Sequence, residues 1–177
     1  LTVFVYLAKN VIPVDYGGSS DPYIKAGFGG VKTRTKAVLE NLNPKFYEKL
    51  NIPIMEPSPT DRVIIKLYDA NKVLKDQRLG TLLLSLKDIR AGKHKLPKWY
   101  QFYSTPKSSP ILEIKALMDK QPEFASTYAG EVLMSMDVRT EERPKLEAVS
   151  MTTSEFEKID DDMVPVHFTL QIDVLYA

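Results

Sequence analysis

The chain has 177 residues, of which 24 are Lys or Arg and 23 are Asp or Glu, so its formal net charge is +1. This balance excludes a protein that is held on nucleic acid by its overall charge, and an anionic partner has to be met by a local patch. The sequence has no cysteine, which excludes disulfides and thiolate metal sites, and no apolar run approaches the roughly 18 residues of a membrane-spanning helix.

Short apolar segments separated by turn residues dominate the chain. We expect eight strands, at residues 1–8, 22–28, 32–38, 46–54, 62–68, 80–86, 98–103 and 130–138. They are rich in Val, Ile, Phe and Tyr, which suit a half-buried pleated surface. Their regular spacing favours an all-β, antiparallel sandwich over alternating strands and helices. Residues 87–91 are expected to form one helical turn.

The pattern changes after residue 103. Residues 111–118 have mixed periodicity, which is compatible with a short helix or an added strand. Residues 141–165 are rich in acidic residues, Thr and Lys, and predict an irregular connection. Residues 166–177 alternate again, and predict either an extra strand of this sandwich or the first strand of a following domain. We therefore expect a domain at residues 1–140, followed by that connection and that strand.

The turn between the first two strands holds two acidic residues. Asp15 and Asp21 bracket a Gly/Ser loop, six positions apart. Two carboxylates held this close together offer hard oxygen ligands to a cation such as calcium. Asp and Gly are also ordinary turn residues, so the loop on its own favours a solvated turn over a metal site.

A composite of motifs in chain order resembles the C2 domain family. The first is Asp15 followed by Asp21-Pro-Tyr-Ile-Lys, which resembles the first calcium loop of that family. The second, at residues 42–48, resembles its Asn-Pro-x-aromatic-x-Glu turn. The third, at residues 67–71 with Leu79-Gly80 after it, resembles its third calcium loop. The likeness covers residues 1–103 and implies an eight-stranded antiparallel β-sandwich.

A narrower likeness is to ferlins, which are large tail-anchored proteins with serial C2 domains. Residues 28–35, 98–100 and 130–136 are similar to ferlin segments, and ferlins often have a long insertion before the last strand. Because residue 1 already leads into the first calcium loop, the strand at 130–138 is expected to close the sheet beside the first strand. In the C2 family this arrangement is called type II topology.

The resemblance implies a calcium site with a reduced number of carboxylates. The family usually uses two Asp residues in the first loop and three in the third. Asn71 stands where the second Asp of the third loop is usual, and Gln77 takes the third place, with Asp76 one position early. Fewer charges weaken calcium binding, so we expect an affinity of ~10⁻⁴ M or poorer, or a vestigial site. The candidate ligands are Asp15, Asp21, Asp69, Asn71, Asp76 and Gln77.

A basic strand follows the first loop. Arg34 and Lys36 alternate along residues 32–38 and are expected on one face. The resemblance implies a phosphoinositide site there, formed by Tyr23, Arg34, Lys36 and Tyr68. Each cation near an anionic leaflet contributes about 1 kcal/mol to binding. The alternative is a solvated strand face without a ligand.

The third loop carries an apolar pair between two lysines. Val73 and Leu74 stand between Lys72 and Lys75, a pattern that suits insertion at the headgroup boundary of a membrane. The alternative is that these apolar side chains turn inward and pack beneath the loop.

These features predict a membrane phospholipid-binding module of a larger vesicle-trafficking, exocytosis or membrane-fusion protein, with calcium dependence weakened or lost. The alternative is a protein-interaction or architectural C2 domain that binds neither ligand. We expect the cytoplasmic face of membranes, a membrane-anchored parent chain of which this is a fragment, and anionic phospholipids, phosphoinositides and neighbouring domains as partners. His94 and His167 lie far apart in the sequence, and no clustered acid–base or metal-ligand set predicts an enzyme.

Overall fold

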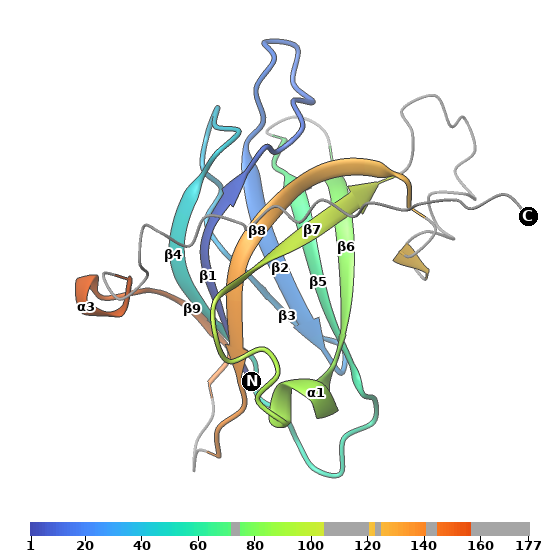
Figure 1. The fold of residues 1–177 in the computed structure, drawn as a ribbon, viewed down its shortest axis with the longest axis vertical. Coiled ribbons are helices and arrows are strands. Elements are labelled where there is room, and N and C mark those ends of the chain that lie inside the picture. The colour runs from blue at the N-terminus through green and yellow to red at the C-terminus, as the bar shows by residue number, and fades with distance from the viewer. Residues whose placement is uncertain (72–74, 105–120, 123–124, 141–144, 157–177) are drawn as a thin grey trace, which may run out of the picture.

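The structure is a computed structural model that describes residues 1–71, 75–104, 121–122, 125–140 and 145–156. These ranges contain nine strands and two short helices (Figure 1). The strands are β1 (Thr2–Lys9), β2 (Pro22–Phe28), β3 (Val31–Arg34), β4 (Lys45–Asn51), β5 (Arg62–Asp69), β6 (Gln77–Ser85), β7 (Lys98–Ser104), β8 (Thr127–Asp137) and β9 (Glu147–Ser150). The helices are α1 (Leu86–Arg90) and α3 (Thr153–Phe156).

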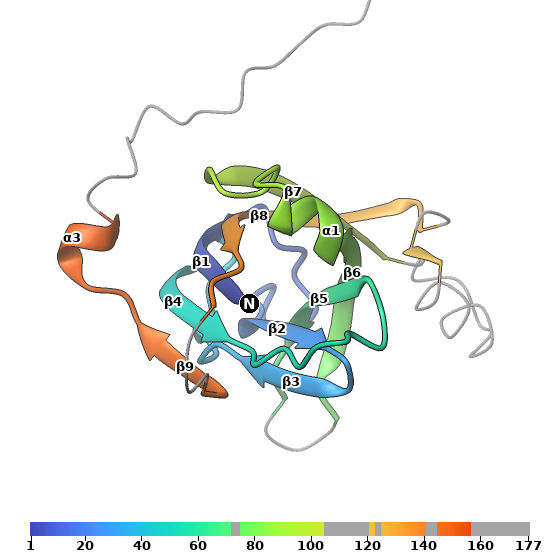
Figure 2. The ribbon, with the colours of Figure 1, turned by 90° about the horizontal axis from the view of Figure 1, so that it is seen from below.

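Two antiparallel sheets face each other. One has the order β7-β8-β1-β4-β9 and the other has the order β3-β2-β5-β6, and the view along the strands shows the two layers around a common interior (Figure 2). β1 lies between β4 and β8, with Val3 opposite Leu50 on one side and Met136 on the other. This pairing confirms the expectation that the strand predicted at residues 130–138 lies beside the first strand. The predicted β-sandwich is confirmed as well.

The core lies between the sheets because apolar residues alternate along the strands. Val3 and Val5 of β1 and Ile65 and Leu67 of β5 are fully buried. Ile24 of β2 joins them in one continuous cluster. Burying an aliphatic side chain of this size contributes about 1.5–3 kcal/mol to folding, so the two sheets form a firm frame for the loops.

Three connections gather at one end of this frame. They are residues 10–21, residues 35–44, and the described ends of the third loop, residues 70–71 and 75–76; the first two stand at the top of the molecule in Figure 1. Backbone hydrogen bonds join them, from Asn41 to the carbonyl of Ser20 at 2.9 Å and from Ala70 to the carbonyl of Asp21 at 2.9 Å. The first and third loops, which carry the candidate calcium ligands, are therefore held side by side.

The strand predicted at residues 32–38 is shorter than expected. β3 ends at Arg34, and the next residue, Thr35, is buried. The amide of Ile24 donates to the Thr35 hydroxyl at 3.0 Å, and the amide of Lys36 donates to the carboxylate of Glu48 in the other sheet at 2.9 Å. β3 therefore ends before Lys36. The chain still runs beside β2, since the amides of Thr35 and Val38 donate to the carbonyls of Ile24 and Pro22, and the Lys36 side chain is exposed.

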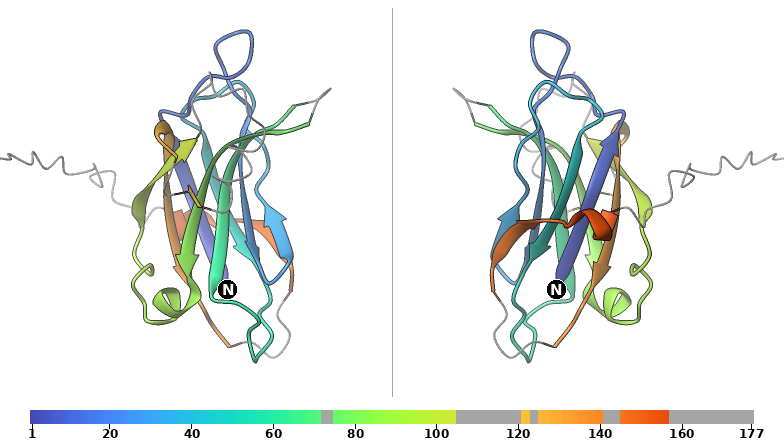
Figure 3. Two further views of the ribbon diagram at one scale, coloured as in Figure 1. Left: turned by 90° about the vertical axis from the view of Figure 1, so that its right-hand side faces the viewer. Right: turned by 90° about the vertical axis from the view of Figure 1, so that its left-hand side faces the viewer.

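A ninth strand forms within the stretch that the sequence predicts to be an irregular connection. Residues 147–150 pair antiparallel with β4, and the segment of β9 and α3 lies along the β4 side of the sandwich (Figure 3). All four side chains of β9 are exposed, so the strand leaves no alternating apolar pattern in the sequence. Met151, which is buried beside Tyr6 and Leu133, anchors the segment.

Two further expectations concern helices and the end of the chain. The predicted helical turn is confirmed as α1, which Ser85 caps by accepting the amide of Asp88. Residues 111–118 and the strand predicted at 166–177 lie outside the described residues. Among the residues that are described, no helix is long and apolar enough to cross a membrane.

Candidate functional site

The first and third loops bring two of the predicted acidic residues, Asp21 and Asp69, into contact. Asp69, the last residue of β5, is buried, and its Oδ1 accepts the amide of Asp21 at 2.6 Å. The Asp21 side chain accepts the amide of Glu40 at 2.8 Å. The backbone of Asp15 forms the turn below the apex of the first loop, where its carbonyl accepts the amide of Gly18 at 3.0 Å.

The electrostatics of Asp69 reflect this grouping. Burial raises the pKa of its carboxyl, and the charges of Asp15, Asp21 and Asp76 raise the pKa further. The hydrogen bond from the Asp21 amide acts in the opposite direction and lowers the pKa. A carboxylate destabilised by neighbouring carboxylates favours a bound cation. Within the described ranges, however, three or more His, Cys, Asp or Glu side chains nowhere form a group that could hold a metal ion.

The other predicted ligands that the structure describes are exposed or already hydrogen-bonded. Asn71 and Gln77 are exposed, and Gln77 begins β6 opposite Asp69. Asp76 has both carboxylate oxygens engaged, since Oδ1 accepts the amide of Asn71 at 3.1 Å and Oδ2 accepts the hydroxyl of Tyr23 at 2.7 Å. The donor set fits calcium only in part. Val73 and Leu74 lie outside the described residues.

Tyr23 and Tyr68 form the centre of the outer face of the four-stranded sheet. They sit opposite each other on β2 and β5, and their rings stack with centroids 5.2 Å apart. The guanidinium of Arg34 lies 4.9 Å from the centre of the Tyr23 ring, and the ammonium of Lys25 lies 5.9 Å from that of Tyr68. Two cations are therefore held against one aromatic pair.

Strand register adds further basic residues to this face. Lys25 of β2 is paired with Arg34 of β3 on one side and with Lys66 of β5 on the other, and paired residues point to the same face. Lys25, Lys32, Lys66 and Tyr68 also line a pocket of about 210 Å³. We call this surface the basic face, and define it by Tyr23, Lys25, Lys32, Arg34, Lys66 and Tyr68.

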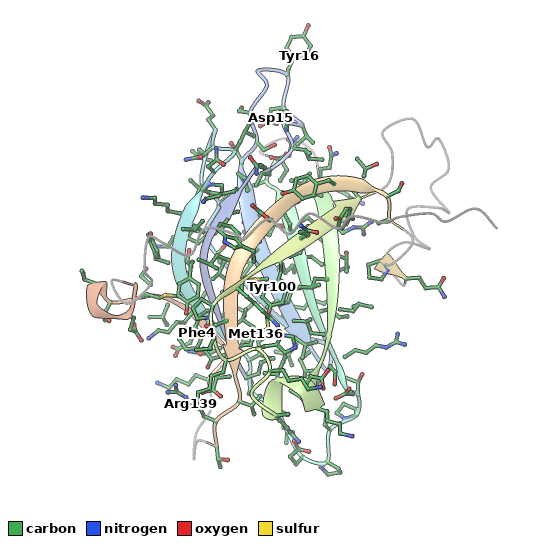
Figure 4. All side chains as sticks on the ribbon, viewed as in Figure 1. Phe4, Asp15, Tyr16, Tyr100, Met136 and Arg139 are labelled. Carbon is green, nitrogen blue, oxygen red and sulfur yellow. The ribbon has the colours of Figure 1, made fainter. Side chains whose placement is uncertain are left out.

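Two residues near the candidate site, Lys66 and Tyr16, were not predicted from the sequence. Lys66 stands two positions before Tyr68 on β5, and strand alternation from Tyr68 would have identified it. Tyr16 was not singled out either; it stands at the apex of the first loop above Asp15 and is fully exposed (Figure 4). Lys36, which was expected on the basic face, follows the end of β3, and its amide donates to the carboxylate of Glu48.

Solved structures with a similar fold include C2 domains of extended synaptotagmins. A structure of two C2 domains of Extended-Synaptotagmin 2 matches 77% of this chain and 39% of that one, at 21% identity with a TM-score of 0.54. A single C2 domain of plant Extended Synaptotagmin 1 matches 79% of this chain and 95% of that one, at 19% identity with the same TM-score of 0.54. These similarities establish the fold.

Curated proteins resemble the chain over part of their length. Protein kinase C, eye isozyme, of Drosophila melanogaster is 31% identical over 59% of this chain and 15% of its own. Myoferlin of Xenopus tropicalis is 30% identical over 61% of this chain and 5% of its own length. Ferlin 2 of Toxoplasma gondii is 22% identical over 88% of this chain and 10% of its own length. The chain thus spans a small part of these relatives. The family model of the C2 domain matches residues 1–102, and the chain belongs to the C2 domain family.

Proposed function

We propose that this C2 domain is a membrane-binding module that holds the phosphates of anionic phospholipids, phosphoinositides included, on its basic face. The observation that carries the proposal is the register of β3, β2 and β5, which sets Arg34, Lys25 and Lys66 in one row across the sheet. A phosphate carries several acceptor oxygens, and a row of fixed cations beside a pocket suits a multivalent anion. The parent chain then acts at the cytoplasmic face of membranes, in vesicle trafficking or fusion.

The aromatic residues of this surface support a headgroup site. The Tyr23–Tyr68 stack gives a flat apolar floor, and its rings attract the cations of Arg34 and Lys25 and so hold them in place. Tyr16, exposed at the apex of the first loop, adds an amphipathic side chain of the kind that settles at the headgroup boundary. The similarity of the chain to a ferlin, myoferlin, and to Synaptotagmin-2 of Arabidopsis thaliana supports a trafficking role.

Calcium has a reduced role in this proposal. The described acidic residues gather around Asp69 without forming a metal-binding group, and Asp76 is engaged by Tyr23. Charge on the basic face then supplies the attraction, and this attraction persists when calcium is removed.

Co-sedimentation with vesicles tests the proposal. Vesicles of neutral lipid, of neutral lipid with phosphatidylserine, and of neutral lipid with a phosphatidylinositol bisphosphate are compared in calcium and in chelator. We expect binding to both anionic compositions in chelator, strongest with the bisphosphate, and a clear loss as salt rises from about 0.1 to 0.5 M, because salt screens exposed charges. No binding to any vesicle would favour the protein-interaction alternative, and equal binding to neutral vesicles would contradict an anion site on the basic face.

A further inference from the structure

The carboxylate of Asp76 occupies two groups of the basic face. Its Oδ2 accepts the hydroxyl of Tyr23 at 2.7 Å and lies 3.6 Å from the guanidinium of Arg34. Its Oδ1 accepts the amide of Asn71 at 3.1 Å. The hydrogen bond from Tyr23, then that from Asn71, and then the charge of Arg34 hold the pKa of Asp76 below its usual range. An Asp carboxyl ordinarily carries its negative charge at neutral pH.

These contacts are the ones that a phosphate would make at the same place. An anionic oxygen that accepts a tyrosine hydroxyl beside a guanidinium is a pattern shared by carboxylates and phosphates. Arg34 lies over the ring of Tyr23, so one small anion reaches both groups at once. While Asp76 is in this position, a headgroup phosphate meets a basic face whose charge is partly neutralised.

The contact is also weak enough to be displaced. The Arg34 side chain is 58% exposed and that of Asp76 is 33% exposed. Ion pairs with this much exposure are strongly screened by water and salt. Asp76 lies in the connection just before β6, outside the paired part of the strand, so its side chain can leave the basic face without breaking the pairing of β5 with β6.

We propose that Asp76 is an internal competitor for the anion site. Because it rests on Tyr23 and Arg34, it raises the charge density that a ligand needs in order to bind. The inference rests on the proposed function and adds a regulatory residue to it. A headgroup with several phosphates displaces Asp76 more readily than one whose single phosphate is a diester, because a phosphodiester carries no more charge than the carboxylate it replaces, whereas a phosphomonoester does.

Calorimetric titration with inositol 1,4,5-trisphosphate in calcium-free buffer tests the competition directly. Asp76→Asn keeps the shape of the side chain and removes its charge, and we expect it to bind the probe roughly three- to tenfold more tightly than the wild type. Glu40→Gln is the matched control, since it removes one exposed negative charge at the same end of the sandwich, and it should change affinity less than twofold. Asp76→Ala serves if Asp76→Asn unfolds.

A double variant tests whether Asp76 acts through Arg34. Arg34→Gln alone should weaken binding, and adding Asp76→Asn to it should restore much less affinity than Asp76→Asn adds to the wild type. The same variants on vesicles that contain a phosphatidylinositol bisphosphate show whether the gain extends from a free phosphate to a lipid headgroup.

The outcomes separate this inference from the proposed function. If Asp76→Asn binds no more tightly than the wild type while Arg34→Gln weakens binding, the internal competitor is refuted and the basic face stands. If the gain is the same with and without Arg34, the contact is irrelevant and the competitor is likewise refuted. If neither the wild type nor Asp76→Asn binds the probe or the vesicles, both proposals fall.

Discussion

The ring of Tyr23 lies almost parallel to that of Tyr68, with 7° between the planes and 5.2 Å between the centroids. The two residues are direct partners on β2 and β5, so the stack is a consequence of strand register. Stacked aromatic pairs of this kind contribute about 0.5–1.5 kcal/mol beyond the area they bury. The pair thereby fixes the floor against which Arg34 and Lys25 are held, and connects the packing of the sheet to the binding of an anion.

Arg34 and Lys36 should differ in their contribution to vesicle binding. Arg34 contacts the Tyr23 ring, whereas Lys36 follows the end of β3. We expect Arg34→Glu to weaken binding to anionic vesicles by at least ~10-fold, because a cation near the surface contributes about 1 kcal/mol and reversal doubles the change. Lys36→Glu should weaken it several-fold less. Equal losses of affinity, measured by co-sedimentation, would mean that Lys36 is part of the binding surface.

Calcium should bind weakly, and through the first loop. With the described acidic residues grouped only around Asp69, we expect a dissociation constant of ~10⁻⁴ M or weaker. Asp15→Asn combined with Asp21→Asn should remove the heat of calcium binding in titration calorimetry, while Glu40→Gln should leave it unchanged. Heat that persists in the double variant would place calcium elsewhere.

Gly130 should be intolerant of any side chain. Its φ of +127° is unfavourable for other residues, and a Cβ there would lie 3.0 Å from the Cα of Val11. We expect Gly130→Ala to lower the free energy of unfolding by about 1–3 kcal/mol, since neither backbone can move freely. Gly17→Ala is the control, because nothing lies within 4 Å of a Cβ at Gly17. Denaturant unfolding that finds both variants equally stable would contradict the close approach.

The segment of β9 and α3 should loosen at acidic pH. Lys49 donates to both oxygens of Glu155, at 2.9 and 3.1 Å, and this bond is the main reason that the pKa of Glu155 falls from 4.5 to about 2. A pKa lowered by folding stabilises the folded state above the ordinary value, and the contribution disappears as pH falls through about 2. The pair is partly exposed, so we expect it to contribute less than ~1 kcal/mol.

Urea unfolding of Glu155→Gln checks this dependence. The variant should be less stable than the wild type at pH 7, and the difference should shrink toward zero between about pH 4.5 and pH 2 as Glu155 of the wild type takes up a proton. Glu147→Gln, which changes a carboxylate of the same segment that is bonded to the amide of Asn51, is the control. A difference that is independent of pH would mean that the ion pair is not what the substitution removes.

Much of the fold follows from local pattern. Alternation in β1 and β5, with turn residues between the strands, was enough to predict a sandwich, since a strand can bury only every second side chain. β9 was not predicted because its four side chains are all exposed and its position depends on β4, which is distant in the sequence. The early end of β3 was not predicted either, since it depends on the hydrogen bond that the amide of Ile24 donates to the Thr35 hydroxyl.

The candidate site was predictable to a smaller extent. Tyr23, Arg34 and Tyr68 do meet, because their strands are neighbours. The partner of Asp76 was not foreseen. A count along the third loop places Asp76 next to the calcium ligands, but the direction of its side chain is set by Tyr23 across the sheet, which spacing in one loop does not reveal.

The most direct test of the basic face compares two matched pairs of substitutions. Lys25→Gln with Lys66→Gln removes two charges from the basic face, and Lys45→Gln with Lys145→Gln removes two exposed charges from the side of the other sheet. In chelator, on vesicles that contain a phosphatidylinositol bisphosphate, we expect the first pair to lose roughly 30-fold in affinity, at about 1 kcal/mol for each charge. The second pair should stay within about twofold of the wild type. Equal losses from both pairs would contradict a binding site on the basic face.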